Sequence, residues 1–258
     1  TTNVINMAQG EFTVWGGLAL VLFCTRLGLP LYIAFILGTG GAFMLGVIIE
    51  RVVMRQLRGA LLLTLFVATL AISYTISGFA LLVFGKEPQA FGSFSGDAPL
   101  KVLGAFISPQ ALWILGFACI ICLVLWFFFT RTIYGKAMMA CSEDRIAARA
   151  MGINVDRMAF LSWGISGAIG ASAGALIIPI TLMSFNAGGA FLIKGIAAAI
   201  LGGTGSYPGA VIGGLLIGCF ESIAAAFVSP LNKDIFAMAS IFVVILLRPS
   251  GILGRKDE

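Results

Sequence analysis

Histidine is absent from the 258 residues of this chain, and charged residues make up only 10% of it. Without histidine there is no histidine-ligated metal site and no serine or cysteine nucleophile activated by a histidine base. A phosphate-binding loop is excluded as well. The glycine-rich GGTGSYPG has Pro208 where that loop needs glycine, no strand precedes it, and no Walker lysine follows it. We therefore do not expect an enzyme.

The five cysteines do not point to a metal or redox centre. Cys119 and Cys122 have the C-x-x-C spacing of such centres, but they lie inside an unbroken apolar stretch that continues through Trp126 and three phenylalanines. Cysteines in such surroundings usually serve packing. The sequence predicts no metal and no cofactor.

Hydrophobic residues make up 60% of the chain, and the mean hydropathy is +1.07. Apolar runs of about 18 residues or more recur along it, which is typical of transmembrane helices. Their hydrophobicity is continuous rather than alternating, which favours helices over a barrel. The net charge of +5 is scattered over short loops, so we expect no nucleic-acid partner. The fold class we predict is all-α, a polytopic transmembrane helical bundle embedded in lipid.

Six spans are expected, and one segment of the chain does not fit a simple span. Between Gly188 and Phe227 two apolar pieces are joined by a glycine- and proline-rich break at residues 202–209. These pieces must either cross twice or dip in together, so we expect broken or re-entrant helices. Gly170 and Gly174 have the spacing that lets helix backbones touch. The expected spans are residues 10–26, 31–49, 61–84, 113–129, 159–182 and 235–247.

Basic residues indicate which loops face the cytoplasm. They gather in residues 51–58, in residues 131–157 and in the C-terminal tail, which by the positive-inside rule are cytoplasmic. The loop of residues 85–109 then lies outside. It is the best candidate surface for an extracytoplasmic partner.

A charged segment of nearly thirty residues, 130–158, separates two apolar spans. Within it SEDRIAARAMGI is expected to form one short helix, capped by Ser142, with Glu143 and Asp144 at its positive end and Arg149 near its negative end. Gly152 is expected to end this helix with a left-handed turn, after which Asn154 caps the next helix. Such a helix is too short to cross a bilayer and must lie at the surface. From the residues alone it is either a solvated loop or a coupling helix for a motor subunit.

The segment KAMMACSEDRIAARAMGINVDR resembles the cytoplasmic loop of the permease subunits of branched-chain amino acid ATP-binding cassette importers, the LivH-type family. Four further segments are similar to motifs of this family, in the same order: VINMAQGEF, IERVVMRQLR, KGIAAAILGGTGSYPGAVIGGLLIG and RPSGILGRKDE. The resemblance covers nearly the whole chain. It implies a single permease domain over residues 1–258, with a coupling loop at 131–157. The family begins with at least one more helix, so we expect a further helix in front of residue 1; an unusual start of the chain is the alternative.

The resemblance implies a pore subunit that moves leucine, isoleucine and valine, or related small amides, across the bacterial inner membrane by alternating access, with a cytoplasmic C-terminus. The implied partners are two ATP-binding subunits, a second identical or homologous permease, and an extracytoplasmic substrate-binding protein. The implied contacts with the ATPase are Glu143, Asp144, Arg145, Gly152 and Asp156. An ion-coupled secondary transporter or channel is the alternative.

Five polar side chains in apolar surroundings are candidates for the transport pathway. Lys194 and Glu221 are ionisable groups inside apolar runs, which mark either a functional site or a buried pair. The N-terminal motif contributes Asn6, Gln9 and Glu11, which either satisfy a broken helix or line the pathway. The family commonly has histidine at the position of Gln9. Because glutamine cannot be protonated in this way, any proposal that transport needs a protonatable side chain at this position is put in doubt for this chain.

Overall fold

The computed structural model describes residues 6–57, 59–96, 98–102, 105–203, 205, 207–227 and 251, and the statements below concern these residues. The chain divides into two compact units, residues 1–189 and residues 190–258. The predicted last span, residues 235–247, lies outside the described residues.

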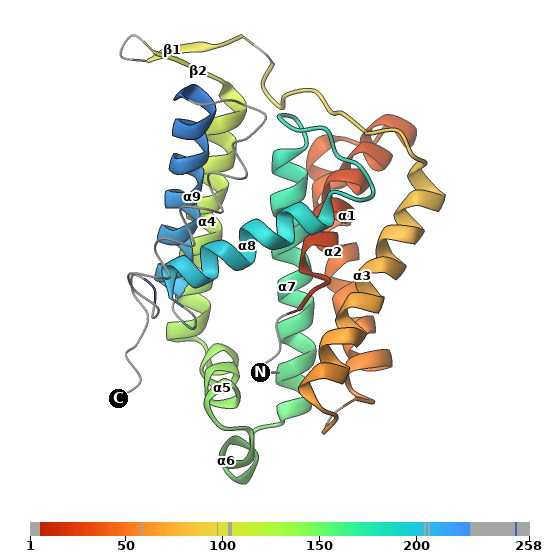
Figure 1. The fold of residues 1–258 in the computed structure, drawn as a ribbon, viewed down its shortest axis with the longest axis vertical. Helices are drawn as coiled ribbons and strands as arrows, with labels where there is room; N and C mark the ends of the chain where they lie inside the picture. Colours follow the sequence, from red (N-terminus) through yellow and green to blue (C-terminus); the bar gives the residue numbers. More distant parts are fainter. Residues whose placement is uncertain are drawn as a thin grey trace. The chain divides into compact units, whose positions relative to one another are not determined.

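Helices account for nearly all of the regular structure in the described residues (Figure 1). A two-stranded antiparallel hairpin is the exception, with Leu100 opposite Ile107. It lies in the loop that was expected outside, and the sequence did not predict it. The elements of the first unit are α1 (Gln9–Val21), η1 (Leu22–Arg26), α2 (Leu31–Ile49), η2 (Glu50–Met54), α3 (Leu62–Phe84), β1 (Leu100–Val102), β2 (Ala105–Ile107), α4 (Pro109–Arg131), α5 (Ile133–Glu143), α6 (Arg145–Ala150) and α7 (Val155–Ile177). Helix α8 (Gly188–Gly202) begins at the unit boundary, and α9 (Tyr207–Phe227) follows it.

Five helical segments in the described residues are long and apolar enough to cross a membrane. This confirms the all-α polytopic fold. Helix α8 has only 15 residues, and at 1.5 Å per residue it is shorter than the roughly 30 Å hydrocarbon core. The break predicted after it is present, since α8 ends at Gly202 and α9 begins at Tyr207. The five segments are Leu31–Met54, Leu62–Phe84, Pro109–Arg131, Val155–Ile177 and Pro208–Phe227.

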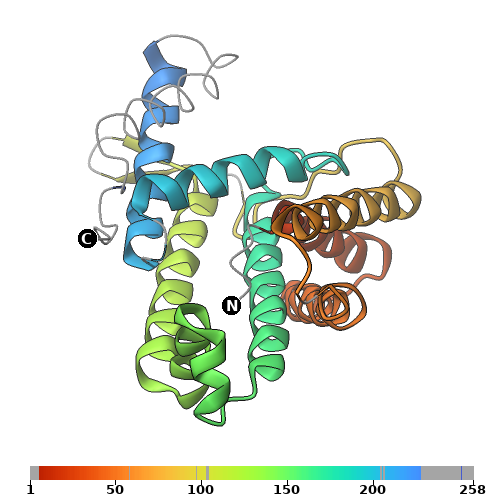
Figure 2. The ribbon, with the colours of Figure 1, turned by 60° about the horizontal axis from the view of Figure 1, so that its bottom comes forward.

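The core of the first unit is built on α7, which lies against α1 and α2 in both ribbon views (Figures 1 and 2). Glycines make this contact close. A Cβ atom on Gly174 would overlap the backbone carbonyl oxygen of Thr13 in α1, and one on Gly46 in α2 would overlap that of Trp163 in α7. The predicted role of Gly174 in backbone contact is thus confirmed. Helices α1 and α2 thus both pack against α7 at backbone distance.

Helix α1 is the most enclosed helix of this core, because nearly all of its residues are buried. Phe12, Leu18 and Leu20 are completely shielded from solvent. Since α2 and α7 surround it, α1 needs no lipid-facing side. Its polar residues Gln9 and Glu11 are therefore placed inside protein rather than in lipid.

Two contacts join the segments that flank α3 to those that flank α7, one contact at each end of these helices. Gln89, after α3, forms an antiparallel bridge with Met183, after α7, with N···O distances of 2.8 and 2.9 Å. At the opposite ends of these helices, Arg55 after η2 forms an ion pair with Asp156 in the first turn of α7. Helices α3 and α7 therefore run in the same direction.

Candidate coupling helix and transport pathway

The charged segment forms two helices, not the single helix expected from sequence. Helix α5 ends at Glu143, and Asp144 then adopts an extended conformation, with φ −144° and ψ 113°, before α6 begins. Asp144 Oδ1 accepts hydrogen bonds from the backbone N–H groups of Ile146 (2.7 Å) and Ala147 (3.0 Å). The prediction that Ser142 is the cap is wrong, since its hydroxyl donates to the carbonyl oxygen of Met139 within α5. Aspartate is a preferred N-cap residue, because its side chain can bond the first N–H groups of a helix. At Asp144 these bonds replace the continuation of α5 and start a new helix.

Glu143 occupies a different place from the one predicted. It is the last residue of α5 and is exposed, so it lies at the negative end of that helix rather than at the positive end of α6. Arg149 does lie in the last turn of α6, where a cation is favourable. The charges of Glu143, Asp144 and Arg145 are therefore consecutive in sequence but belong to a helix end, a cap and a helix start.

The turn after α6 has the geometry predicted from Gly152. This glycine has φ +82°, its N–H bonds to the carbonyl oxygen of Arg149, and the N–H of Ile153 bonds to that of Ala148. These two bonds define a Schellman motif, in which a left-handed residue ends the helix. Asn154 then caps α7, since its side-chain oxygen accepts from the N–H of Arg157 at 3.0 Å. Helix α6 is thus joined to α7 by a short turn with fixed hydrogen bonds.

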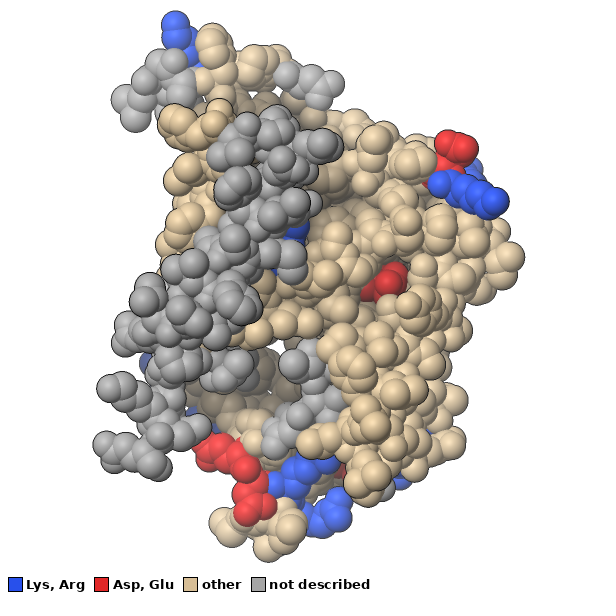
Figure 3. Space-filling view, in the orientation of Figure 1, with Lys and Arg blue, Asp and Glu red and all other residues tan. Residues whose placement is uncertain are grey.

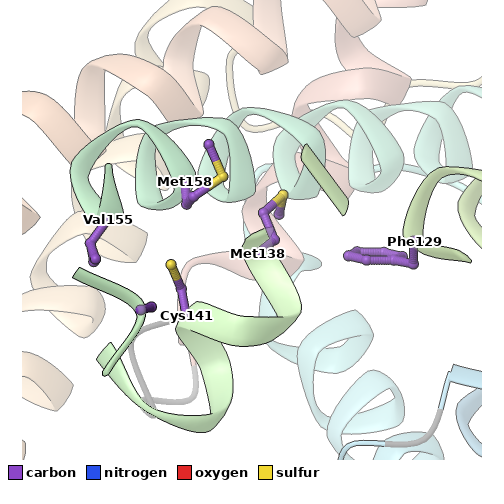
Figure 4. Close-up of a cluster of buried hydrophobic side chains, with 6 residues drawn as sticks. Phe129, Met138, Cys141, Val155 and Met158 are labelled. Atoms are coloured by element: carbon purple, nitrogen blue, oxygen red, sulfur yellow. The ribbon is translucent and has the colours of Figure 1, made fainter. Parts of the chain in front are cut away.

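Apolar side chains hold α6 against its neighbours (Figure 4). Met138 and Cys141 of α5 point toward Val155 and Met158 of α7, and Phe129 at the end of α4 belongs to the same cluster. Ala148 is the buried contribution of α6. Burial also raises the pKa of the Cys141 thiol, so it stays uncharged at neutral pH and suits an apolar cluster.

The opposite side of α6 is exposed and partly apolar. Ile146 is 84% exposed, and Met151, directly after the helix, is 83% exposed. The neighbouring residues Asp144, Arg145 and Arg149 are charged and exposed, and acidic and basic side chains gather on the surface near α5 and α6 (Figure 3). A charged surface is not covered by lipid tails. Beside them is a groove of about 490 Å³ lined by Arg145, Ile146, Arg149, Ala150, Val155 and Ala159.

Asp156 connects the charged segment to the first basic loop. Its carboxylate lies 3.7 Å from Nη2 of Arg55 and 4.0 Å from Nη2 of Arg149. All three side chains are substantially exposed, so each pair by itself contributes little to stability. The arrangement nonetheless places α6, the start of α7 and the loop after η2 beside one another. The sequence missed Arg55 as a member of this site, although its place in a basic loop was visible.

The N-terminal motif is held by hydrogen bonds inside the first unit. Asn6 Oδ1 accepts from the N–H of Ala8 at 3.0 Å. Gln9 forms two bonds with Ser166 of α7: Nε2 donates to the carbonyl oxygen at 3.1 Å, and Oε1 accepts from the hydroxyl at 2.5 Å. Asn6 and Gln9 thus satisfy the beginning of α1, which is one of the two roles that the sequence left open. Ser166 was not predicted, and only its place among small residues in GISGAIG hinted at a close contact.

Glu11 is more deeply placed than the other polar residues of this motif. It is 5% exposed, lies in the first turn of α1, and accepts a 3.0 Å hydrogen bond from the hydroxyl of Ser73. Ser73 is the central residue of the 23-residue helix α3, and Ser166 is the central residue of the equally long α7. The polar notch formed by Gln9, Glu11 and these two serines therefore lies near the middle of the spans.

Lys194 and Glu221 form an ion pair in the second unit. Nζ of Lys194 in α8 lies 2.8 Å from Oε1 of Glu221 in α9. The pair forms because α8 and α9 pack closely, with Gly202 against the backbone of Gly209 and Gly213 against that of Ala198. The two charges compensate each other, which is the structural role that the sequence analysis allowed for them. In the described part of the chain, no three acidic or cysteine side chains are grouped so as to hold a metal ion.

The amino-acid sequence of this chain matches one family of known proteins. The family model described as "Branched-chain amino acid transport system / permease component" matches residues 1–246. The high-affinity branched-chain amino acid transport system permease protein LivH of Salmonella typhimurium is 30% identical over 98% of this chain and 87% of its own length. The corresponding protein BraD of Pseudomonas aeruginosa is 32% identical, with the same shares covered. The fructose import permease protein FrcC of Rhizobium meliloti is 30% identical over 84% of this chain and 62% of its own length. No solved structure matches the chain.

Proposed function

The chain belongs to the family of permease components of branched-chain amino acid transport systems, and we propose that it is the pore subunit of an importer driven by separate ATP-binding subunits. The cargo is leucine, isoleucine, valine or a related small amide, and the membrane is the bacterial inner membrane. A second permease, identical or homologous, completes the pore. A substrate-binding protein delivers the cargo from the side that carries the β1–β2 hairpin.

The observation that carries this proposal is the exposed side of α6. Ile146 and Met151 are almost fully exposed at a charged end of the molecule, where lipid does not cover them. Apolar side chains ringed by charges are typical of protein–protein interfaces. Arg145 and Arg149 line the adjacent groove. Helix α6 thus presents exposed apolar side chains, two arginines and a groove. This combination suits a contact with an ATP-binding subunit in the cytoplasm.

Force applied to α6 has a direct route into the membrane-spanning core. Helix α6 is tied to α7 by the Gly152 turn, by the Asn154 cap and by the cluster around Met158. Helix α7 in turn contacts α1 and α2 at backbone distance. Closure of an ATP-binding dimer would therefore move α7, α1 and α2 together. Such rigid-body motion is how alternating access proceeds in many transporters.

The proposal is tested by breaking the α6–α7 turn. Proline at Gly152 requires φ near −65°, whereas the turn has φ +82°. We expect the Gly152→Pro variant to insert into the membrane but to lose ATP-dependent leucine uptake in vesicles that contain the ATP-binding subunits and the binding protein. Gly152→Asn is the matched control, because asparagine tolerates the left-handed conformation and should keep most of the uptake.

A second arm tests the charges. Reversing Glu143 and Asp144 to lysine removes the cap of α6 and two acidic charges beside it, and we expect uptake and co-purification of the ATP-binding subunits to be lost together. Normal ATP-dependent uptake by both the Gly152→Pro and the charge-reversed variants would refute the coupling role of α6. Purification of a fully active chain without any ATP-binding partner would refute the importer.

A further inference from the structure

Glu11 combines deep burial with incomplete pairing. Its side chain is 5% exposed, and Oε1 accepts from the hydroxyl of Ser73. Oε2 is buried and has no hydrogen-bond partner among the described residues. A carboxylate removed from water normally has partners for both oxygens, because an unpaired buried charge is costly. Oε2 of Glu11 is thus a hydrogen-bond acceptor that remains available near the middle of the spans.

The carboxyl group of Glu11 is directed at the first turn of α8. A Cβ atom on Gly188, the first residue of α8, would lie 2.6 Å from Oε2. The first N–H groups of a helix have no partner within the helix and carry its positive partial charge. The next residue, Gly189, has open space beside it, since a Cβ atom there would meet nothing within 4 Å. Both glycines belong to the same compact unit as Glu11.

An acidic side chain and the first residues of a helix therefore lie side by side. These are the two groups that an α-amino acid zwitterion requires, because its ammonium group seeks an acceptor and its carboxylate seeks N–H donors. Transporters use the starts of short helices near the membrane midplane to bind anionic parts of their cargo. Helix α8 is short, and its first residue, Gly188, lies against Glu11, which is bonded to Ser73 at the centre of α3.

We propose that Glu11, Ser73, Gly188 and Gly189 form a subsite for the charged end of an α-amino acid in transit. Glu11 Oε2 binds the ammonium group, and the N–H groups of Gly188 and Gly189 bind the carboxylate. The inference rests on the proposed transport function and narrows its cargo, because sugars and neutral amides lack this pair of charges. In the present conformation Gly188 closes over the carboxyl group, so the subsite opens when the first turn of α8 leaves α1.

Other polar groups of the pathway are poorer candidates for this role. Gln9 is neutral and bonded through both side-chain atoms to Ser166. Lys194 and Glu221 are paired with each other at 2.8 Å. Two buried side-chain oxygens in the described residues have no hydrogen bond, Oε1 of Glu221 and Oε2 of Glu11. The Glu221 oxygen lies against the Lys194 ammonium group, whereas Glu11 has no ion pair among the described residues.

The test uses the assembled complex in membrane vesicles, with a photoactivatable diazirine analogue of leucine as the probe. Cross-linked peptides are identified by mass spectrometry in the absence of the binding protein. We expect labelling of peptides that contain Ser73 or Gly188–Ala190. Excess leucine should suppress this labelling, whereas 4-methylpentanoate, which lacks the ammonium group, and 3-methylbutylamine, which lacks the carboxylate, should not.

Variants connect the labelling to transport. Glu11→Gln should reduce both the labelling and leucine uptake about tenfold or more, as expected for loss of a charge-assisted hydrogen bond, while the complex assembles and hydrolyses ATP. Glu11→Asp should restore part of the uptake. Gly188→Ala should also reduce uptake, because its Cβ meets the carboxyl group, whereas Gly195→Ala on the same helix is the control, with open space at its Cβ.

The outcomes separate this inference from the proposed function. If the wild-type complex does not take up leucine, the proposed function itself is refuted. If it takes up leucine but Glu11→Gln is labelled and transports at the wild-type rate, the subsite is refuted. Suppression of labelling by 4-methylpentanoate as strong as that by leucine would also refute it. Equal loss of assembly in Glu11→Gln and Glu11→Asp would assign Glu11 a structural role instead.

Discussion

At the scale of single residues, one side chain decides how the charged segment folds. SEDRIAARAMGI has good helix formers on both sides of Asp144, and a continuous helix is what propensity favours. Asp144 instead turns its carboxylate onto the N–H groups of Ile146 and Ala147 and starts a new helix. The change of direction exposes Ile146 and buries Ala148. The exposed side of α6 therefore depends on a cap.

We predict that Asp144→Ala loosens α6 by about 1 kcal/mol, the usual loss for an N-cap. Hydrogen exchange of the Ile146 and Ala147 amides should then be about fivefold faster. Asp144→Asn is the control, since asparagine caps as well as aspartate, and its exchange should match the parent chain. Unchanged exchange in Asp144→Ala would show that α6 is held by packing alone.

At the scale of elements, the contacts of α7 with α1 and α2 are made by glycines. Gly174 touches the backbone of Thr13, and Gly46 touches that of Trp163. In a membrane the hydrophobic effect does not drive helices together, so close packing of small residues must do so. Helix α7, held by these contacts, carries the Gly152 turn before its first residue and the polar notch at its centre.

A methyl group is enough to test this packing. Gly174→Ala places a Cβ against the backbone of α1, and overpacking of this kind costs about 1–3 kcal/mol. We predict a clearly lower unfolding temperature in detergent. Gly78→Ala in α3 is the matched control, because its Cβ has open space and alanine favours a helix by about 0.5–1 kcal/mol. Equal stability of the two variants would contradict the backbone contact.

At the scale of the whole molecule, the two ends of the first unit differ. One end carries α6, the Asp156 ion pairs and the loop after η2, and the other carries the bridge between Gln89 and Met183. The basic residues lie mainly at the first end, so the positive-inside rule predicts that this end faces the cytoplasm. We then expect the hairpin that follows the bridge to face the other side of the membrane.

Labelling of single cysteines tests this orientation. In a chain whose five native cysteines are replaced, Lys101→Cys in β1 should react with a membrane-impermeant thiol reagent added to intact cells. Ile146→Cys in α6 should react only in inverted vesicles. Both side chains are exposed in the present structure, so burial does not limit the reaction. Reaction of both from the same side would overturn the orientation.

The sequence by itself determined four of the membrane-spanning helices, α2, α3, α4 and α7, and the turn at Gly152, because these features depend on local hydrophobicity, length and backbone preference. The predicted first span, residues 10–26, is not among the segments long and apolar enough to cross a membrane, and the short surface helix is divided in two at Asp144. Hydrophobic runs mark spans wherever lipid is the solvent, and a left-handed turn calls for glycine in any context. The bounds of Leu31–Ile49 were predicted as the structure has them. The residues also marked Glu11, Lys194 and Glu221 as exceptional.

Only the tertiary structure decided what those exceptional residues do. The pairing of Lys194 with Glu221 required the close crossing of α8 and α9, and the contact of Glu11 with Ser73 and Gly188 joined residues from three distant segments. Asp156 likewise met Arg55 across about a hundred residues of chain. Such contacts are set by how helices pack, and packing is decided by shape over the whole bundle rather than by any local run of residues.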